Sequence, residues 1–462
     1  MGDNLLISGL GIIILAGILV FLRVLQIKRL DFVAIFLGTV GVFHGGFPVL
    51  IYWVAEVRGL ESESVTQLIS YADSYAWLYF ALVFIFAIGT FLGGILRYKE
   101  RIVAKSASWL KTLSLRDARR LVFIGWYLLA LSVISYWLFS KAYGGFFSLF
   151  LNAMYIRAGL YDDIAAANPW SFLGKFGGLS FISSFIFLGV LIAKPQPKKL
   201  SITLWAKIGF LLSFFFSLFV IWSWWSRSHF LFYMIALIGA PLIRKSRFKF
   251  NLKRMWQFIV ILAVLVVLLS AANYKFKGVK TMEDQIARFA NDASIRILPT
   301  FVLLENPEYR WFKDLGLIPV YFLPQKIWRK FVQYTASDVI TVKMMGGRKG
   351  ESGVTGAMVI GAVPFSFLEG GVMGVAILGV IWGMFLGFLD RWLLVKLPPG
   401  ISELLYAYIA FRLVVTSICG ADPQVVIYNT IDIIIGLLFI FMARFQIKVL
   451  AKDAKQLKDQ AN

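Results

Sequence analysis

Apolar runs of about 18 residues or more recur along most of this chain. As a helix, a run of this length crosses a hydrocarbon core about 30 Å thick. Only 16% of the residues are charged and the mean hydropathy is +0.77, whereas in soluble globular proteins about 25% of residues are charged. The alternation of apolar and polar residues that is typical of β-barrels is missing. The sequence therefore predicts an all-α polytopic membrane protein.

The lengths and spacing of the apolar runs predict about 11 transmembrane helices. Short loops and the tail on one side of these spans hold 27 Lys and Arg, whereas the other side, apart from one long loop, holds five. Because positive short loops stay in the cytoplasm, we expect the amino terminus outside and the carboxyl terminus inside. The approximate spans are 5–22, 32–54, 75–96, 121–139, 177–193, 204–222, 230–243, 258–271, 370–389, 404–418 and 425–443.

One long polar segment, residues 273–369, interrupts the apolar pattern. It is rich in Lys, Arg and aromatic residues, which suits an anionic, lipid-linked substrate. We therefore divide the chain into residues 1–272 with helices 1–8, residues 273–369 as a large helical loop on the outer face, and residues 370–462 with helices 9–11 and a cytoplasmic tail.

Composition argues against several other functions. The net charge of +22 lies mostly in short cytoplasmic loops, so it indicates membrane topology and not nucleic-acid binding. One cysteine and two histidines cannot form a Cys/His zinc site. The glycine-rich turn around Arg348 lacks the Gly-Lys-Ser ending of a nucleotide-binding loop. We expect no metal and no cofactor.

Two residues could carry chemistry on position alone. Arg227 lies at the outer end of the sixth and seventh spans, among tryptophans. Its guanidinium can bind phosphate oxygens through two parallel hydrogen bonds, or it can extend to lipid headgroups beside an aromatic belt. Glu369 lies at the start of a span. It is either a reactive carboxylate or an anion stabilised by the helix dipole.

Three stretches of the second half resemble the Wzy-type oligosaccharide repeat-unit polymerases, also called O-antigen polymerases. Ser226-Arg227-Ser228 before an apolar span is similar to the serine-arginine turn of that family. Leu323-Pro-Gln-Lys-Ile-Trp328 resembles its Pro-Arg-x-x-Trp segment, with Gln325 in place of the arginine. Gly361-Ala-Val-Pro364 and Gly371-Val-Met-Gly374 resemble its Gly-Glu and Phe-Gly-x-x-Gly stretch, with Ala362 in place of the glutamate.

The resemblance implies a GT-C-like, inverting, metal-independent membrane glycosyltransferase. Such an enzyme transfers a growing glycan from undecaprenyl diphosphate to the incoming lipid-linked repeat unit. The resemblance thus implies a location in a bacterial inner (cytoplasmic) membrane. Arginines would neutralise the leaving diphosphate, a proton acceptor would activate the acceptor hydroxyl, and aromatic rings would stack on sugars. Our candidates are Arg227, Arg296 and Arg348 for the diphosphate, Glu369, His229 and Asp422 for the proton, and Trp311, Tyr321 and Trp328 for the sugars.

Other functions fit the same layout. An O-antigen ligase would share the donor but transfer the glycan to lipid A core. A lipid-linked oligosaccharide flippase would need a polar cavity within the spans, and a polytopic scaffold would tolerate replacement of the outer arginines. For a polymerase, the expected partners are lipid-linked oligosaccharides, membrane lipids, and the chain-length regulator and flippase of the same pathway.

Overall fold

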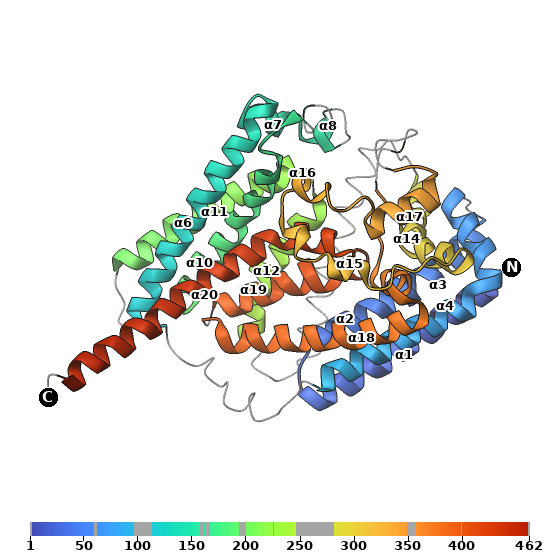
Figure 1. The fold of residues 1–462 in the computed structure, drawn as a ribbon, viewed down its shortest axis with the longest axis horizontal. Coiled ribbons are helices and arrows are strands. Elements are labelled where there is room, and N and C mark those ends of the chain that lie inside the picture. Colours follow the sequence, from blue (N-terminus) through green and yellow to red (C-terminus); the bar gives the residue numbers. More distant parts are fainter. Residues whose placement is uncertain are drawn as a thin grey trace. The chain divides into compact units, whose positions relative to one another are not determined.

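A computed structural model gives the fold of the protein as two compact units (Figure 1). The first unit contains α1–α4, α14–α18, η7 and the start of α20, and the second contains α6–α12, α19 and the rest of α20. The described residues are helical and contain no strand. They are residues 2–59, 62–96, 113–157, 161, 164, 167–193, 200–224, 226–245, 281–348, 354, 357–398 and 400–460.

Eight helical segments in the described part of the chain are long and apolar enough to cross a membrane. Each of them overlaps a span predicted from the sequence, so the all-helical, multi-pass character is confirmed. The eight segments are Asp3–Ile27, Phe32–Val57, Glu63–Leu96, Leu115–Tyr143, Ser171–Ala193, Leu200–Ser223, Ala362–Leu394 and Pro423–Met442.

The three remaining predicted spans have different outcomes. The span at 230–243 falls in the 19-residue helix α12 (Arg227–Lys245), in which Ser228–Ile238 is an apolar stretch. The span at 258–271 lies outside the described residues. The span at 404–418 forms α19 (Ile401–Ile409) and then the π-helical turn η7 (Ala410–Val415). The total of 11 spans and their orientation stay predictions.

Close contact between α4 (Glu63–Leu96) and α18 (Ala362–Lys396) is a central feature of the first unit. A Cβ atom added to Gly93 would overlap the carbonyl oxygen of Val380, and one added to Gly383 would overlap that of Thr90. Glycines therefore let the two backbones touch, as is common between helices in membranes. The unit also contains α1 (Asp3–Ile27), α2 (Phe32–Val40), η1 (Gly41–Gly46), α3 (Phe47–Tyr52) and η2 (Trp53–Val57).

The described part of the long polar segment packs onto this helical unit. Its first helix, α14 (Met282–Glu305), begins after Thr281, whose side chain accepts a hydrogen bond from the Asp284 amide. The Ser294 hydroxyl donates to the Ser64 hydroxyl of α4 over 2.8 Å. The rest of the segment forms α15 (Lys313–Gly316), η6 (Val320–Phe322), α16 (Gln325–Trp328) and α17 (Ala336–Met345).

The second unit has a core of apolar helices joined by buried serines. The Ser183 hydroxyl donates to the Gly125 carbonyl over 2.7 Å, and the Ser217 hydroxyl donates to that of Ser180 over 3.0 Å. These bonds satisfy polar groups that would be costly in an apolar environment. Its elements are α6 (Leu115–Ser140), η4 (Lys141–Tyr143), α7 (Phe146–Leu151), α8 (Ala153–Arg157), η5 (Ser171–Gly178), α10 (Leu179–Ala193), α11 (Leu200–Ser223), α12 and α19, with α20 (Pro423–Gln460) from residue 429 onward.

Candidate functional site

A strained turn of the polar segment pairs with a break in α18. The amide of Arg310 donates to the Leu368 carbonyl over 2.8 Å, and the amide of Phe312 donates to the Glu369 carbonyl over 3.0 Å. Trp311 and Phe312 have φ values of 50° and 61°, a left-handed conformation that costs each non-glycine residue about 1–2 kcal/mol. Strain of this kind in a compact structure often marks a functional site.

The break in α18 falls immediately after Glu369. Gly371 has a φ of 62° and Gly370 also departs from helical geometry. A Cβ atom on Gly371 would lie 3.2 Å from the Tyr309 ring, and one on Gly370 would lie 3.4 Å from the Phe312 ring. Glycine is therefore needed at position 371, both for the backbone conformation and for the close approach of the Tyr309 ring.

Glu369 is a buried carboxylate with unused hydrogen-bonding capacity. Its relative exposure is 0%, and neither of its oxygens has a hydrogen-bond partner in the described part of the protein. The carboxyl of Asp314 and the guanidinium of Arg310 are close enough to act on it electrostatically. A buried carboxylate normally accepts several hydrogen bonds. Its free oxygens can accept a proton or a hydroxyl group from a ligand.

An arginine–aspartate pair supports this carboxylate. The Arg310 Nε atom lies 2.6 Å from Asp314 Oδ2, and both side chains are almost fully buried. The Arg310 guanidinium also donates to the Tyr334 carbonyl over 2.8 Å. The Tyr321 hydroxyl donates to Asp314 Oδ1 over 3.2 Å. Asp314 is thus held in place by two side chains.

Asp422 is a second buried carboxylate in the same unit. It precedes α20 and accepts hydrogen bonds from the Ser337 amide over 2.9 Å and from the Gln424 amide over 3.0 Å. Burial raises its pKa above the ordinary value, and the nearby Asp314 adds to this effect, while the two amides oppose it. Asp422 is therefore within electrostatic range of the Arg310–Asp314 pair, but its own oxygens are already occupied.

Two predicted phosphate ligands lie in this unit. Arg296 of α14 is exposed and lies close enough to Cys419 to lower the pKa of its thiol. The Arg348 guanidinium lies 3.5 Å from the centre of the Tyr334 ring, a cation–π contact. Tyr334 also supplies the carbonyl that Arg310 binds, so Arg348 is connected to the carboxylate cluster through one residue.

The three predicted sugar-binding aromatics differ in accessibility. Trp311 is 70% exposed on the strained turn. Tyr321 and Trp328 are buried and form an apolar core with Val332 and Ile427, their rings meeting edge to face at 5.4 Å. Trp311 is thus the one of the three that a sugar can reach without a change in packing.

His229 and Arg227 belong to the second unit, at the start of α12. The Nδ1 atom of His229 hydrogen-bonds to the Ser226 hydroxyl, and its ring lies 4.9 Å from that of Trp224. Arg227 is the first residue of α12. The predicted site residues therefore fall into two groups, with Glu369, Asp422, Arg296, Arg348 and the three aromatics in the first unit and His229 and Arg227 in the second.

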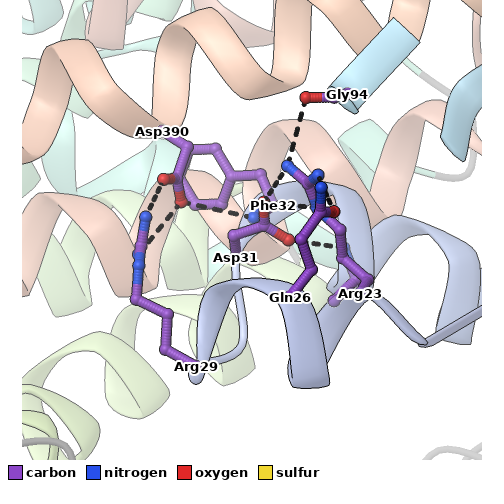
Figure 2. Close-up of polar contacts among 8 residues, drawn as sticks. Arg23, Gln26, Arg29, Asp31, Phe32, Gly94 and Asp390 are labelled. Carbon is purple, nitrogen blue, oxygen red and sulfur yellow. Dashed lines mark hydrogen bonds and ion pairs between the residues drawn. The ribbon is translucent and has the colours of Figure 1, made fainter. Parts of the chain in front are cut away.

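A further polar cluster of the first unit joins α1, α2, α4 and α18 (Figure 2). The Arg23 guanidinium donates to Asp31 Oδ2 from Nη2 over 2.8 Å and to the Gly94 carbonyl over 3.3 Å. Asp390 binds the Arg29 guanidinium and accepts a hydrogen bond from the Phe32 amide over 3.3 Å. Burial and the adjacent Asp390 raise the pKa of Asp31, although Arg23 opposes this. Such a cluster ties four helices together.

Sequence reasoning did not select Arg310 and Asp314. Their spacing of four residues is typical of an ion pair on a helix, and this spacing could have predicted the pair from the sequence. Nothing local in the sequence links them to Glu369, which is more than 50 positions further along.

In the described part of the chain, no three His, Cys, Asp or Glu residues come together in a way that could hold a metal ion. Comparison of the chain with protein-family models, curated proteins and solved structures gave no match.

Proposed function

We propose that this protein is a membrane glycosyltransferase that polymerises oligosaccharide repeat units carried on undecaprenyl diphosphate. The observation that carries the proposal is the Glu369 carboxylate, which is buried and free of hydrogen bonds beside a strained turn. The motif resemblance of the second half supports the same activity. The proposed location is a bacterial cytoplasmic membrane, with the polar segment on its outer face.

The proposed reaction inverts the configuration at the transferred sugar. Glu369 in its ionised form accepts the proton of the acceptor hydroxyl as that oxygen bonds to the anomeric carbon of the growing glycan. The bond from that carbon to the diphosphate oxygen breaks, and the diphosphate leaves with the bonding electrons. Arginines stabilise its negative charge; within the first unit, the proposal gives this role to Arg296 and Arg348. Arg227 belongs to the second unit and is tested separately.

The residues around Glu369 have distinct parts in the proposal. Asp314, anchored by Arg310 and Tyr321, keeps a negative charge beside Glu369 and so favours uptake of the proton. Trp311 stacks on a sugar of the incoming unit because it is exposed on the turn that covers Glu369. Displacement of this turn, with rotation at Gly370 and Gly371, admits the acceptor hydroxyl. Asp422 and His229 are secondary candidates for the proton acceptor.

Complementation in cells tests the proposal. A strain deleted for this gene receives the wild type, Glu369→Gln or Glu283→Gln, and its surface glycan is sized on a gel. Glutamine keeps the shape of Glu369 but cannot accept the proton, and loss of a general base slows a reaction by about 10²–10⁴-fold. We expect single lipid-linked repeat units from Glu369→Gln. Glu283, a 64% exposed glutamate of α14, is the control and keeps the ladder of long chains.

Two outcomes would overturn the polymerase proposal. A normal ladder from Glu369→Gln at wild-type membrane levels removes the proposed base. A deletion strain that already makes long, unattached lipid-linked polymer identifies a ligase instead.

Arg227→Lys tests the diphosphate contact in the same strain. A loss of the ladder indicates paired hydrogen bonds to phosphate, whereas a normal ladder indicates that Arg227 anchors to lipid headgroups.

A further inference from the structure

Apart from Glu369, the buried carboxylates in the described part of the first unit have partners within the protein. Four buried carboxylates have an arginine partner, and Asp422 accepts two backbone amides. An unpaired charge buried away from water is strongly unfavourable, so this pattern is expected. The four pairs are Asp31 with Arg23, Asp390 with Arg29, Asp314 with Arg310 and Asp338 with Arg329.

Arg412 departs from this pattern. It lies in η7, is 6% exposed, and its Nε atom is buried without a hydrogen-bond partner. No ion pair joins its guanidinium to a carboxylate of the described residues. Its main-chain carbonyl accepts a hydrogen bond from the Thr416 hydroxyl, but this leaves the positive charge uncompensated.

The helix that packs against η7 does not supply a negative charge. Helix α2 packs against η7, and its sequence, residues 32–40, has no acidic residue. Asp31, the residue before α2, is bound to Arg23, and Asp390 is bound to Arg29 (Figure 2). The acids next to α2 are thus already in use, and no ion pair among the described residues compensates Arg412.

The local backbone also suggests a binding role. η7 is a π-helical turn between the α-helical residues before and after it, and π-helical turns inside α-helices are frequent at functional sites. Further along, the chain leads to Cys419, which is close to the exposed Arg296. A second arginine therefore lies near the end of the helical segment that carries Arg412.

We propose that Arg412 binds the phosphate group of a membrane lipid, and specifically the diphosphate of the polyprenyl carrier. This rests on the proposed function, which requires a site for that diphosphate. A guanidinium fits phosphate oxygens with parallel hydrogen bonds and keeps its charge at any physiological pH. The bound anion supplies the charge that the protein does not provide. Anionic phospholipids share this chemistry and are the competing source.

Binding to the purified full-length protein in detergent tests the proposal. Thermal unfolding is followed with undecaprenyl diphosphate, with phosphatidylglycerol, or with neither, for the wild type, Arg412→Gln, Arg412→Lys and Arg58→Gln. Arg58, 43% exposed in the same unit, controls for the loss of one positive charge. Each variant is compared with its own unliganded form, so a change in basal stability does not affect the reading.

We expect undecaprenyl diphosphate to raise the unfolding temperature of the wild type and of Arg58→Gln. In Arg412→Gln the concentration needed for the same shift rises about tenfold or more, and Arg412→Lys is intermediate. An equal response of the wild type and Arg412→Gln overturns the proposal. A shift with phosphatidylglycerol alone, lost in Arg412→Gln, overturns the carrier as occupant and assigns the site to phospholipid.

The same measurements with Glu369→Gln separate this proposal from the proposed function. If Glu369→Gln makes normal polymer in cells while the Arg412-dependent shift persists, the anion site stands and the assigned base is wrong. If Glu369→Gln loses the polymer in cells, but undecaprenyl diphosphate produces no unfolding-temperature shift that depends on Arg412, the assigned base stands and the anion site is wrong.

Discussion

The amide of Phe312 donates a hydrogen bond to the carbonyl of Glu369 over 3.0 Å, at the point where both chain segments leave ordinary geometry. Phe312 has a φ of 61°, and Glu369 is followed by two non-helical glycines. The bond therefore couples the strained turn to the break in α18. A change in either segment should move the Glu369 carboxylate.

Gly371→Ala tests this coupling. Alanine at a φ of 62° costs about 1–2 kcal/mol, and its Cβ atom would also press on the Tyr309 ring. We expect lower thermal stability and a shortened glycan ladder. Gly346→Ala is the matched control, because Gly346 has a φ of 74° with open space around it. It should show a similar loss of stability with a normal ladder; equal ladders from both variants would contradict the coupling.

Asp31→Asn should be strongly destabilising. Asparagine can still cap α2 by accepting from the Ala34 amide, but it leaves Arg23, which is 1% exposed, without its counter-charge. Removal of one partner of a buried pair costs about 3–5 kcal/mol. Thermal unfolding in detergent measures this, with Glu283→Gln of an exposed pair as the control, expected to cost less than about 1 kcal/mol.

The double variant Asp31→Asn with Arg23→Met extends this test. It removes both charges, so it should recover much of the stability lost by Asp31→Asn alone. A double variant as unstable as the sum of the single ones would show that the two residues act independently.

The two tryptophans should separate packing from binding. Trp328 is fully buried in the core with Tyr321, so Trp328→Ala should cost about 3–5 kcal/mol. Trp311 is 70% exposed, and Trp311→Ala should leave the unfolding temperature nearly unchanged while weakening the use of lipid-linked acceptor. Unfolding curves and glycan gels of the two variants make the comparison. A normal ladder from Trp311→Ala would remove it from the proposed sugar site.

Cys419 should react slowly with alkylating reagents. Burial raises the pKa of its thiol to about 11, and Arg296 opposes this only in part. Because the thiolate is the reactive form, about one thiol in a thousand is ionised at pH 8, against about a quarter for a free cysteine. The alkylation rate of the folded protein should rise about tenfold per pH unit from pH 8 to pH 10. Arg296→Gln should slow it further, and a fast, pH-independent reaction would contradict this environment.

The sequence was most informative about the membrane-spanning helices, where many consecutive residues must all be apolar. Apolar runs such as those around Leu19 and Leu82 predicted helices that the structure contains, because membrane crossing imposes one length and one composition. The segment 404–418 was predicted as a continuous span, but it contains η7. A π-helical turn depends on how its helix packs against neighbours, and no single residue of Ala410–Val415 signals it.

The candidate site was only partly accessible to this reasoning. Glu369 and Asp422 were selected as single residues, and the structure places them both in reach of Asp314. The pairing of Phe312 with Glu369 is a long-range contact between a turn and the residue before a break in α18, so no periodicity reveals it. Tyr321 and Trp328 were predicted as sugar contacts because aromatic rings stack on sugars, yet a small apolar core shared with Ile427 buries them.

The crossing of α4 and α18 gives the sharpest packing test. A Cβ atom on Gly383 would overlap the Thr90 carbonyl, which belongs to the backbone and cannot rotate away. Gly383→Leu should therefore force the helices apart, at a cost of about 1–3 kcal/mol or more. Gly17→Leu in α1 is the control, because nothing lies within 4 Å of its Cβ position. Since α18 carries Glu369 near its other end, Gly383→Leu should also reduce polymer length, and a variant that unfolds and polymerises like Gly17→Leu would show that this contact does not position the site.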